Sequence, residues 1–82
     1  MARGEKLLDQ MRANLRDWRI EDVRAVCTAH GIDLSAPTGG GSHWKVKHRA
    51  MPLILTVPAR RPIKPIYIRE LIPFIDGVRG AE

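Results

Sequence analysis

One histidine combines the residue type and the surroundings that acid–base chemistry requires. His43 directly follows the run Gly39-Gly40-Gly41-Ser42, and Lys45 and Lys47 follow it at alternating positions. Imidazole gains and loses a proton near neutral pH, so it can take a proton from the ribose 2′-hydroxyl of RNA or return one during cleavage. His43 is therefore the candidate catalytic residue, with an inert surface histidine as the alternative.

The net charge of +5 is concentrated in the middle of the chain. Residues 39–69 carry seven Lys or Arg and no Asp or Glu, whereas residues 1–38 carry six of each sign. Such a local excess suits phosphates or an acidic partner protein, with chance surface charge as the alternative. The residues expected to contact RNA are Gly41, Ser42, Lys45, Lys47, Arg49, Arg60, Arg61 and Lys64. For the stretch 60–64, a merely solvated turn is the alternative to phosphate contact.

Five further residues that could do chemistry have simpler structural interpretations. Cys27 lies in the apolar stripe of a predicted helix, which indicates a core residue rather than a nucleophile. His48 alternates with apolar residues, so we expect a hydrogen-bonded, partly buried histidine. His30 precedes a glycine at a helix end, where we expect it to cap the helix. Trp18 is expected to close the helical core. For Trp44 two interpretations stand side by side, a core residue or a residue that stacks on bases.

The size and composition of the chain predict one small domain. Its 82 residues suffice for a single hydrophobic core, so we expect one domain over residues 1–82. The single cysteine excludes an intramolecular disulfide and a cysteine-based zinc cluster, and we expect neither a cofactor nor a metal. No run approaches the roughly 18 apolar residues that cross a bilayer, and the first ten residues lack the apolar centre of a secretory signal. The expected location is cytoplasmic, with no membrane partner.

Three segments have the apolar spacing of helices. Residues 5–15 and 20–30 read as two amphipathic helices, the second capped by Asp17 or a nearby residue and ended by Gly31. A third helix begins after Lys64, with proline at its first position. Because Pro73 lies inside its apolar pattern, we expect a kink or an early break there.

Three further segments have the pattern of strands. These are residues 32–35, 42–49 and 53–57, with a glycine-rich loop before the second and a turn at Ala50-Met51-Pro52 before the third. In the second strand, Val46 and its alternate neighbours point to the core, while His43, Lys45 and Lys47 point outward with Arg49. The sequence thus predicts an α+β fold, in which a three-stranded antiparallel sheet has helices on one face.

Three short motifs in this order resemble the HicA family of toxins. They are Gly41-Ser42-His43-Trp44-Lys45-Val46-Lys47-His48, Leu55-Thr56-Val57-Pro58, and Ile63-Lys64-Pro65 with Ile68-Arg69. Each is weakly specific alone, and the three in order within a small basic chain are more so. The resemblance covers roughly residues 31–75.

The resemblance implies both a fold and an activity. It implies a double-stranded-RNA-binding-like fold over residues 20–78, with residues 1–19 as an additional N-terminal helix. It implies the toxin of a type II toxin–antitoxin system, a metal-independent endoribonuclease that cleaves mRNA with His43 and is inhibited by a HicB-like antitoxin. Gly41 and Ser42 correspond to the turn that presents the histidine. Trp44 departs from the family pattern, in which polar or aliphatic residues are frequent.

Two other classes of function fit the same sequence. The domain could bind RNA through its basic strand face without cutting it. Alternatively, the first helix could dock a partner protein through Leu7, Leu8, Met11 and Leu15, with the basic sheet incidental.

Overall fold

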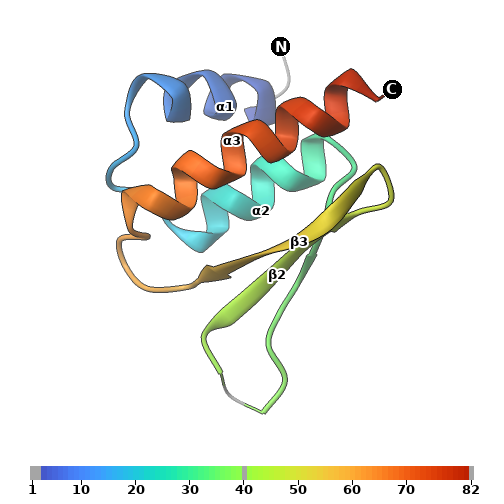
Figure 1. The fold of residues 1–82 in the computed structure, drawn as a ribbon. Helices are drawn as coiled ribbons and strands as arrows, with labels where there is room; N and C mark the ends of the chain where they lie inside the picture. The colour runs from blue at the N-terminus through green and yellow to red at the C-terminus, as the bar shows by residue number, and fades with distance from the viewer. Residues whose placement is uncertain (1–2, 40, 82) are drawn as a thin grey trace.

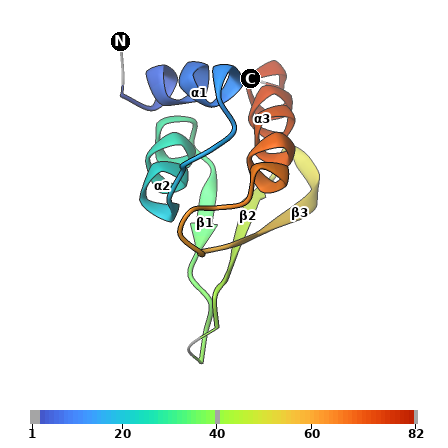
Figure 2. The same ribbon diagram turned by 90° about the vertical axis from the view of Figure 1, so that its left-hand side faces the viewer.

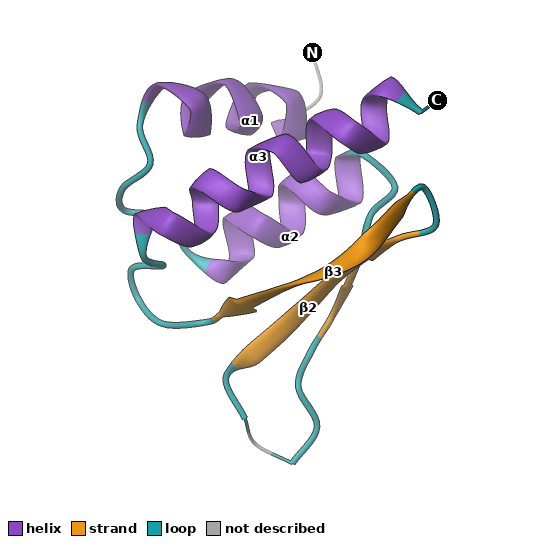
Figure 3. Ribbon diagram, viewed as in Figure 1, coloured by secondary structure: helices purple, strands orange, loops and turns teal. Residues whose placement is uncertain are grey.

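The computed structural model describes residues 3–39 and 41–81 and shows three helices and three strands. Their order along the chain is helix, helix, strand, strand, strand, helix (Figures 1 and 3). The elements are α1 (Arg3–Ala13), α2 (Ile20–Ala29), β1 (Asp33–Ser35), β2 (His43–His48), β3 (Met51–Pro58) and α3 (Pro65–Gly80). The α+β class predicted from the sequence is confirmed.

The sheet is the predicted antiparallel meander, with β2 between β1 and β3. Val46 pairs with Leu34 on one side and with Leu55 on the other, and its side chain is fully buried. The alternate residues of β2, His43, Lys45 and Lys47, are exposed. The period of two in the sequence therefore separates a core face from a polar face, as strand geometry requires.

The helices form two layers on one face of the sheet. α2 and α3 pack on the strands, and α1 lies over both helices on the side away from the sheet (Figure 2). One continuous core results, and α1 contributes three residues to it. Its buried apolar side chains are Leu7, Leu8, Met11, Val23, Val26, Cys27, Ile32, Val46, Val57, Ile63, Ile68, Leu71, Phe74, Ile75 and Val78.

The apolar face of α1 is occupied within the molecule. Leu8 and Met11 have no exposed surface, Leu7 is 9% exposed, and Leu15 packs against the same core. These side chains therefore hold α1 on α2 and α3. The hypothesis that they dock a partner protein is wrong.

α2 is capped by its immediate neighbours. Arg19 is the N-cap residue, and its backbone N–H donates to the Asp22 carboxylate over 3.0 Å. Of the predicted alternatives, Asp17 or a nearby residue, the second is therefore confirmed, and Asp17 adopts a left-handed backbone with φ of 66°. At the other end, Nδ1–H of His30 donates to the carbonyl four residues earlier over 2.8 Å, and Gly31 has φ of 66°. The predicted capping role of His30 is confirmed.

Pro73 does not end α3, which continues to Gly80. Of the two alternatives expected at Pro73, a kink or an early break, the early break is wrong. Proline lacks the N–H that would bond to the carbonyl of Arg69, but both residues are exposed, so that carbonyl can bond to water. Buried side chains on both sides of the proline hold the helix against the core: Leu71, Phe74, Ile75 and Val78.

The hairpin between β2 and β3 is tighter than predicted. His48 pairs with Met51, so Arg49 and Ala50 form a two-residue turn, and the N–H of Ala50 donates to Nδ1 of His48 over 3.0 Å. The predicted turn over residues 50–52 is wrong, because β3 begins at Met51. Pro52 is accommodated because β3 is an edge strand, where one side needs no ladder hydrogen bonds. His48 is half-buried and hydrogen-bonded, as predicted.

The close approach of α1 to α2 depends on Gly4. A Cβ at this position would clash with Cβ of Ala29 and would lie 3.1 Å from the carbonyl oxygen of Ala25.

We expect Gly4→Ala to lower the free energy of unfolding by about 1–2 kcal/mol in urea denaturation, because α1 and α2 must move apart to admit the methyl group. Gly77→Ala is the control: its Cβ would meet only the flexible end of Met51. Alanine there should be neutral or stabilising, and equal losses in both variants would contradict the packing argument.

α1 is also joined to α3 by an ion pair. Arg12 binds both carboxylate oxygens of Asp76, one of them from Nη1 over 2.9 Å. The hydrogen bond from Arg12 lowers the pKa of Asp76 below its ordinary 3.8. The two side chains are 40% and 43% exposed, so solvent screening limits the stability that the pair contributes.

We expect Asp76→Asn to lower the free energy of unfolding by about 0.5–1 kcal/mol at neutral pH. Because the folded-state pKa of Asp76 is lowered, the contribution is present above about pH 4 and is lost as the pH falls through the lowered pKa. Urea denaturation at neutral pH and well below pH 4 measures this, with Glu70→Gln as an exposed control on the same helix. A stability difference that does not change with pH would show that the ion pair is not its source.

Candidate functional site

A hollow of about 240 Å³ lies where β2 begins, β3 ends and α3 begins. His43 and Ser42 line it from β2 and the preceding loop, and Pro58 lines it from β3. The connecting segment and α3 supply the other lining residues, which are Arg60, Lys64 and Tyr67. Residues up to 25 positions apart in the sequence thus surround one space.

Strand pairing brings these residues together. His43 is the register partner of Pro58, and the backbone continues the contact one residue further, where the N–H of Ala59 donates to the carbonyl of Ser42 over 2.7 Å. The residues that directly follow β3 are therefore held beside those that directly precede β2. Arg60 consequently lines the same hollow as His43 although 17 positions separate them in the sequence.

A buried anchor fixes the other end of this connecting segment. Ile63 has no exposed surface, and its backbone N–H donates to the carbonyl of Trp18 over 2.8 Å. Trp18 in turn packs against the core and donates from its indole nitrogen to the carbonyl of Asn14 over 2.7 Å. Lys64 follows the anchor as the N-cap residue of α3, and Tyr67 lies in the first turn of that helix.

The charge lining the hollow is positive. Arg60 and Lys64 are exposed, as is His43, and no carboxylate is among the described residues that line the space. Ser42 and Tyr67 add hydroxyl groups. Guanidinium, ammonium and hydroxyl donors around a small open space suit a phosphate group.

The other predicted bases of β2 lie progressively further away. Lys45 and Lys47 share the exposed face with His43, at about 7 Å and about 13 Å along the strand. Lys47 is the register partner of Asp33 on β1, which places a carboxylate opposite it. Arg49 lies in the turn at the far end of the hairpin, roughly 20 Å from His43. Lys45 is therefore the nearest of these three bases to the hollow, although none of the three lines it.

Arg61 points away from the hollow that holds its neighbour Arg60. Its Nη2 donates to the carboxylate of Glu21 over 3.0 Å, and it lines a separate hollow with Asp17 and Arg19. The sequence grouped Arg61 with the site residues because adjacent bases cannot be distinguished without the fold. Gly41 is exposed and next to the site but does not line it.

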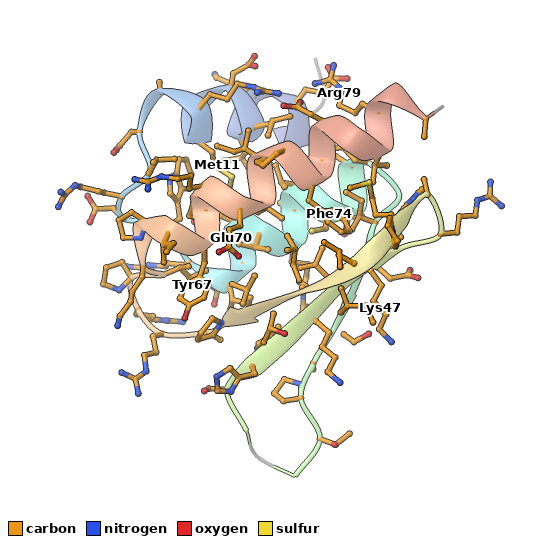
Figure 4. All side chains as sticks on the ribbon, in the orientation of Figure 1. Met11, Lys47, Tyr67, Glu70, Phe74 and Arg79 are labelled. Atoms are coloured by element: carbon orange, nitrogen blue, oxygen red, sulfur yellow. The ribbon has the colours of Figure 1, made fainter. Side chains whose placement is uncertain are left out.

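Sequence reasoning missed two lining residues, Pro58 and Tyr67. Pro58 belongs to the second motif noted above and directly follows the predicted strand over residues 53–57. Tyr67 is the single tyrosine of the chain, and its position shortly after Pro65 in the first turn of a helix was the available signal. Tyr67 projects from the start of α3 toward the end of β3 (Figure 4).

Trp44 belongs to the interface between the sheet and a helix. It is half-buried, and the guanidinium carbon of Arg24 on α2 lies 5.2 Å from the centre of its ring. That arrangement is a cation–π contact. Trp44 is thus in contact with α2 through Arg24 but is not part of the buried core, and its stacking on bases stays a prediction.

The small α+β fold and its cationic hollow define a domain with an exposed histidine beside a positively charged space. Comparisons of the chain with protein-family models, curated proteins and solved structures found no match. None of the helices described here is long and apolar enough to cross a membrane. In the described residues, no three His, Cys, Asp or Glu side chains are grouped as metal ligands.

Cys27 is a core residue in the structure. It has no exposed surface, and burial raises the pKa of its thiol to about 12.

We expect Cys27 to resist a thiol-specific reagent at mildly alkaline pH in the native protein and to react rapidly in denaturant. The measurement is the absorbance of the thiolate that a disulfide reagent releases as it reacts with Cys27, followed over time. Fast labelling of the native protein would contradict the buried placement.

Proposed function

We propose that the protein is a metal-independent endoribonuclease of the HicA type with His43 as its catalytic residue. The observation that carries the proposal is the exposed imidazole of His43 in a hollow with two cations and no carboxylate among its described lining residues. An imidazole sealed in the core could not reach a polyanion. The exposure of His43 meets the first requirement for catalysis on RNA.

The three sequence motifs that resemble the HicA family also converge on this hollow. The first supplies Ser42 and His43, the second supplies Pro58, and the third supplies Lys64. The order α2, β1, β2, β3, α3, with both helices on one face of the sheet, is also the arrangement that the resemblance implies. α1 is then the additional N-terminal helix, joined to this unit through the shared core.

The proposed reaction begins with proton removal by His43. Its neutral imidazole takes the proton of a ribose 2′-hydroxyl, and the 2′-oxygen bonds to the adjacent phosphorus. The bond from phosphorus to the 5′-oxygen of the next nucleotide breaks, that oxygen takes a proton from water, and the imidazolium of His43 releases its proton to the solvent. The products are a 2′,3′-cyclic phosphate and a 5′-hydroxyl. DNA lacks the attacking hydroxyl and should not be cleaved.

Arg60 and Lys64 are placed to stabilise the charge that grows on the non-bridging phosphate oxygens, since they line the same hollow as His43. Lys45 is close enough to contact a neighbouring phosphate. Lys47 and Arg49 extend the positive surface along β2 and hold flanking RNA less directly. Arg61, bound to Glu21, has no role in this step.

The resemblance extends the proposal to the cellular role. The protein would be the toxin of a type II toxin–antitoxin system, acting on mRNA in the cytoplasm and inhibited by a HicB-like antitoxin. Because the hollow is positive, an inhibitor that covers it should present carboxylates or another anion there. Such an association should weaken as the salt concentration rises.

A non-catalytic RNA-binding module is the second candidate. It is favoured by the cationic side chains that continue along β2 beyond reach of His43, since phosphate contacts alone give sequence-independent affinity. A binding module would not depend on His43 for chemistry. Product mapping with variants of the histidines on β2 therefore separates the two candidates.

We expect His43→Ala to slow RNA cleavage about 100-fold or more, because general acid–base catalysis by one group contributes about that much. Its affinity for RNA should change much less. The measurements are cleavage of a labelled RNA, mapping of the new ends as 5′-hydroxyls, and binding by gel shift. His48→Asn is the matched control, because it changes the other histidine of β2 and keeps an acceptor for the Ala50 N–H.

Unchanged cleavage by His43→Ala would overturn the assignment of His43. Absence of cleavage by the native protein, together with RNA binding that survives the substitution, would instead establish the binding module.

A further inference from the structure

The hollow around His43 has two chemically different sides. Arg60 and Lys64 are flexible cations, whereas Pro58 and Tyr67 are rigid rings that are half-buried and so held in place by the fold. Arg60 and Lys64 suffice to balance the negative charge of a phosphate. The rings of Pro58 and Tyr67 add apolar, flat surface, which suits a second part of the ligand that is itself apolar and flat.

The size of the hollow limits what that part can be. Its volume of about 240 Å³ is below the roughly 300–1,000 Å³ of pockets that enclose drug-sized ligands. A single ring system with an attached phosphate fits this scale, and a double helix does not enter. In a duplex, moreover, the faces of the bases are covered by their neighbours, whereas unpaired bases can stack on aromatic side chains.

We propose that Pro58 and Tyr67 form a subsite for one unpaired RNA base, which stacks on the Tyr67 ring while Arg60 and Lys64 hold the phosphate of the same nucleotide. The identity of the ligand as RNA rests on the proposed function. The subsite selects single-stranded or looped RNA over duplex. Stacking needs the ring of Tyr67 and not its hydroxyl, because every base presents a π-face.

The test uses the His43→Ala protein, so that the RNA stays intact, and two probes. One probe is a short single-stranded RNA, and the other is a blunt-ended duplex in which the same sequence is fully paired. We expect Tyr67→Leu to weaken binding of the single strand about 5- to 100-fold and to leave duplex binding within about twofold. Tyr67→Phe should bind both probes like the parent, and Ile66→Ala is the control on α3, because Ile66 is 51% exposed and outside the hollow.

A second measurement tests the same contact by changing the RNA instead of the protein. Single abasic sites are introduced along the single-stranded RNA, one at a time. We expect one position at which the missing base weakens binding about as much as Tyr67→Leu. At that position the two changes together should cost no more than either alone, because both remove the same stacking contact.

Three results would overturn the subsite. They are unchanged single-strand binding by Tyr67→Leu, an equal loss in Tyr67→Phe, or additive losses for Tyr67→Leu with every abasic position. The proposed function can fail independently of the subsite. If the native chain does not cleave RNA but its single-strand binding depends on Tyr67, the nuclease proposal is wrong and the subsite proposal stands. Cleavage by the native chain, together with single-strand binding that does not depend on Tyr67, would keep the nuclease and remove the subsite.

Discussion

The site depends on the pairing of the start of β2 with the end of β3. This pairing, extended by the hydrogen bond from Ala59 to Ser42, holds the exit of one strand beside the beginning of the other. Burial of Ile63 fixes the far end of the connecting segment and contributes about 1.5–3 kcal/mol, as for other fully buried aliphatic side chains. Arg60 and Lys64 are exposed residues on a short segment tied at both ends, which limits how far their side chains can move from His43.

The fold reduces the positive surface that the sequence predicts for residues 39–69. Residues 39–69 contain no acidic residue, yet two acidic residues from outside that stretch lie beside its bases. Glu21 binds Arg61, and Asp33 lies opposite Lys47 in the sheet. The bases that line the hollow, Arg60 and Lys64, have no carboxylate among the described residues that share it. The effective positive centre is therefore smaller than the basic stretch of sequence and is located at one end of the sheet.

The N-terminal helix α1 contributes stability at a distance from the hollow. α1 buries Leu8 and Met11 over α2 and α3, approaches α2 closely at Gly4, and binds α3 through the ion pair from Arg12 to Asp76. The chain that follows α1 also supplies Trp18, whose carbonyl holds Ile63. The N-terminal region is thus connected to the site through the backbone of the anchoring residue, although α1 itself lies on the opposite side of the helical layer (Figure 2).

The sequence by itself determined the helices, the strands and the two faces of β2, because hydrophobic periods of 3.6 and 2 are local properties. It also identified His43 and the basic stretch. Only the tertiary structure separated Arg60 from Arg61 and brought Tyr67 to the histidine, because these outcomes depend on strand register and on contacts between residues far apart in the chain. It also decided that α3 continues through Pro73 and that the turn is at Arg49 and Ala50, since core packing and pairing outweighed the local preference of proline.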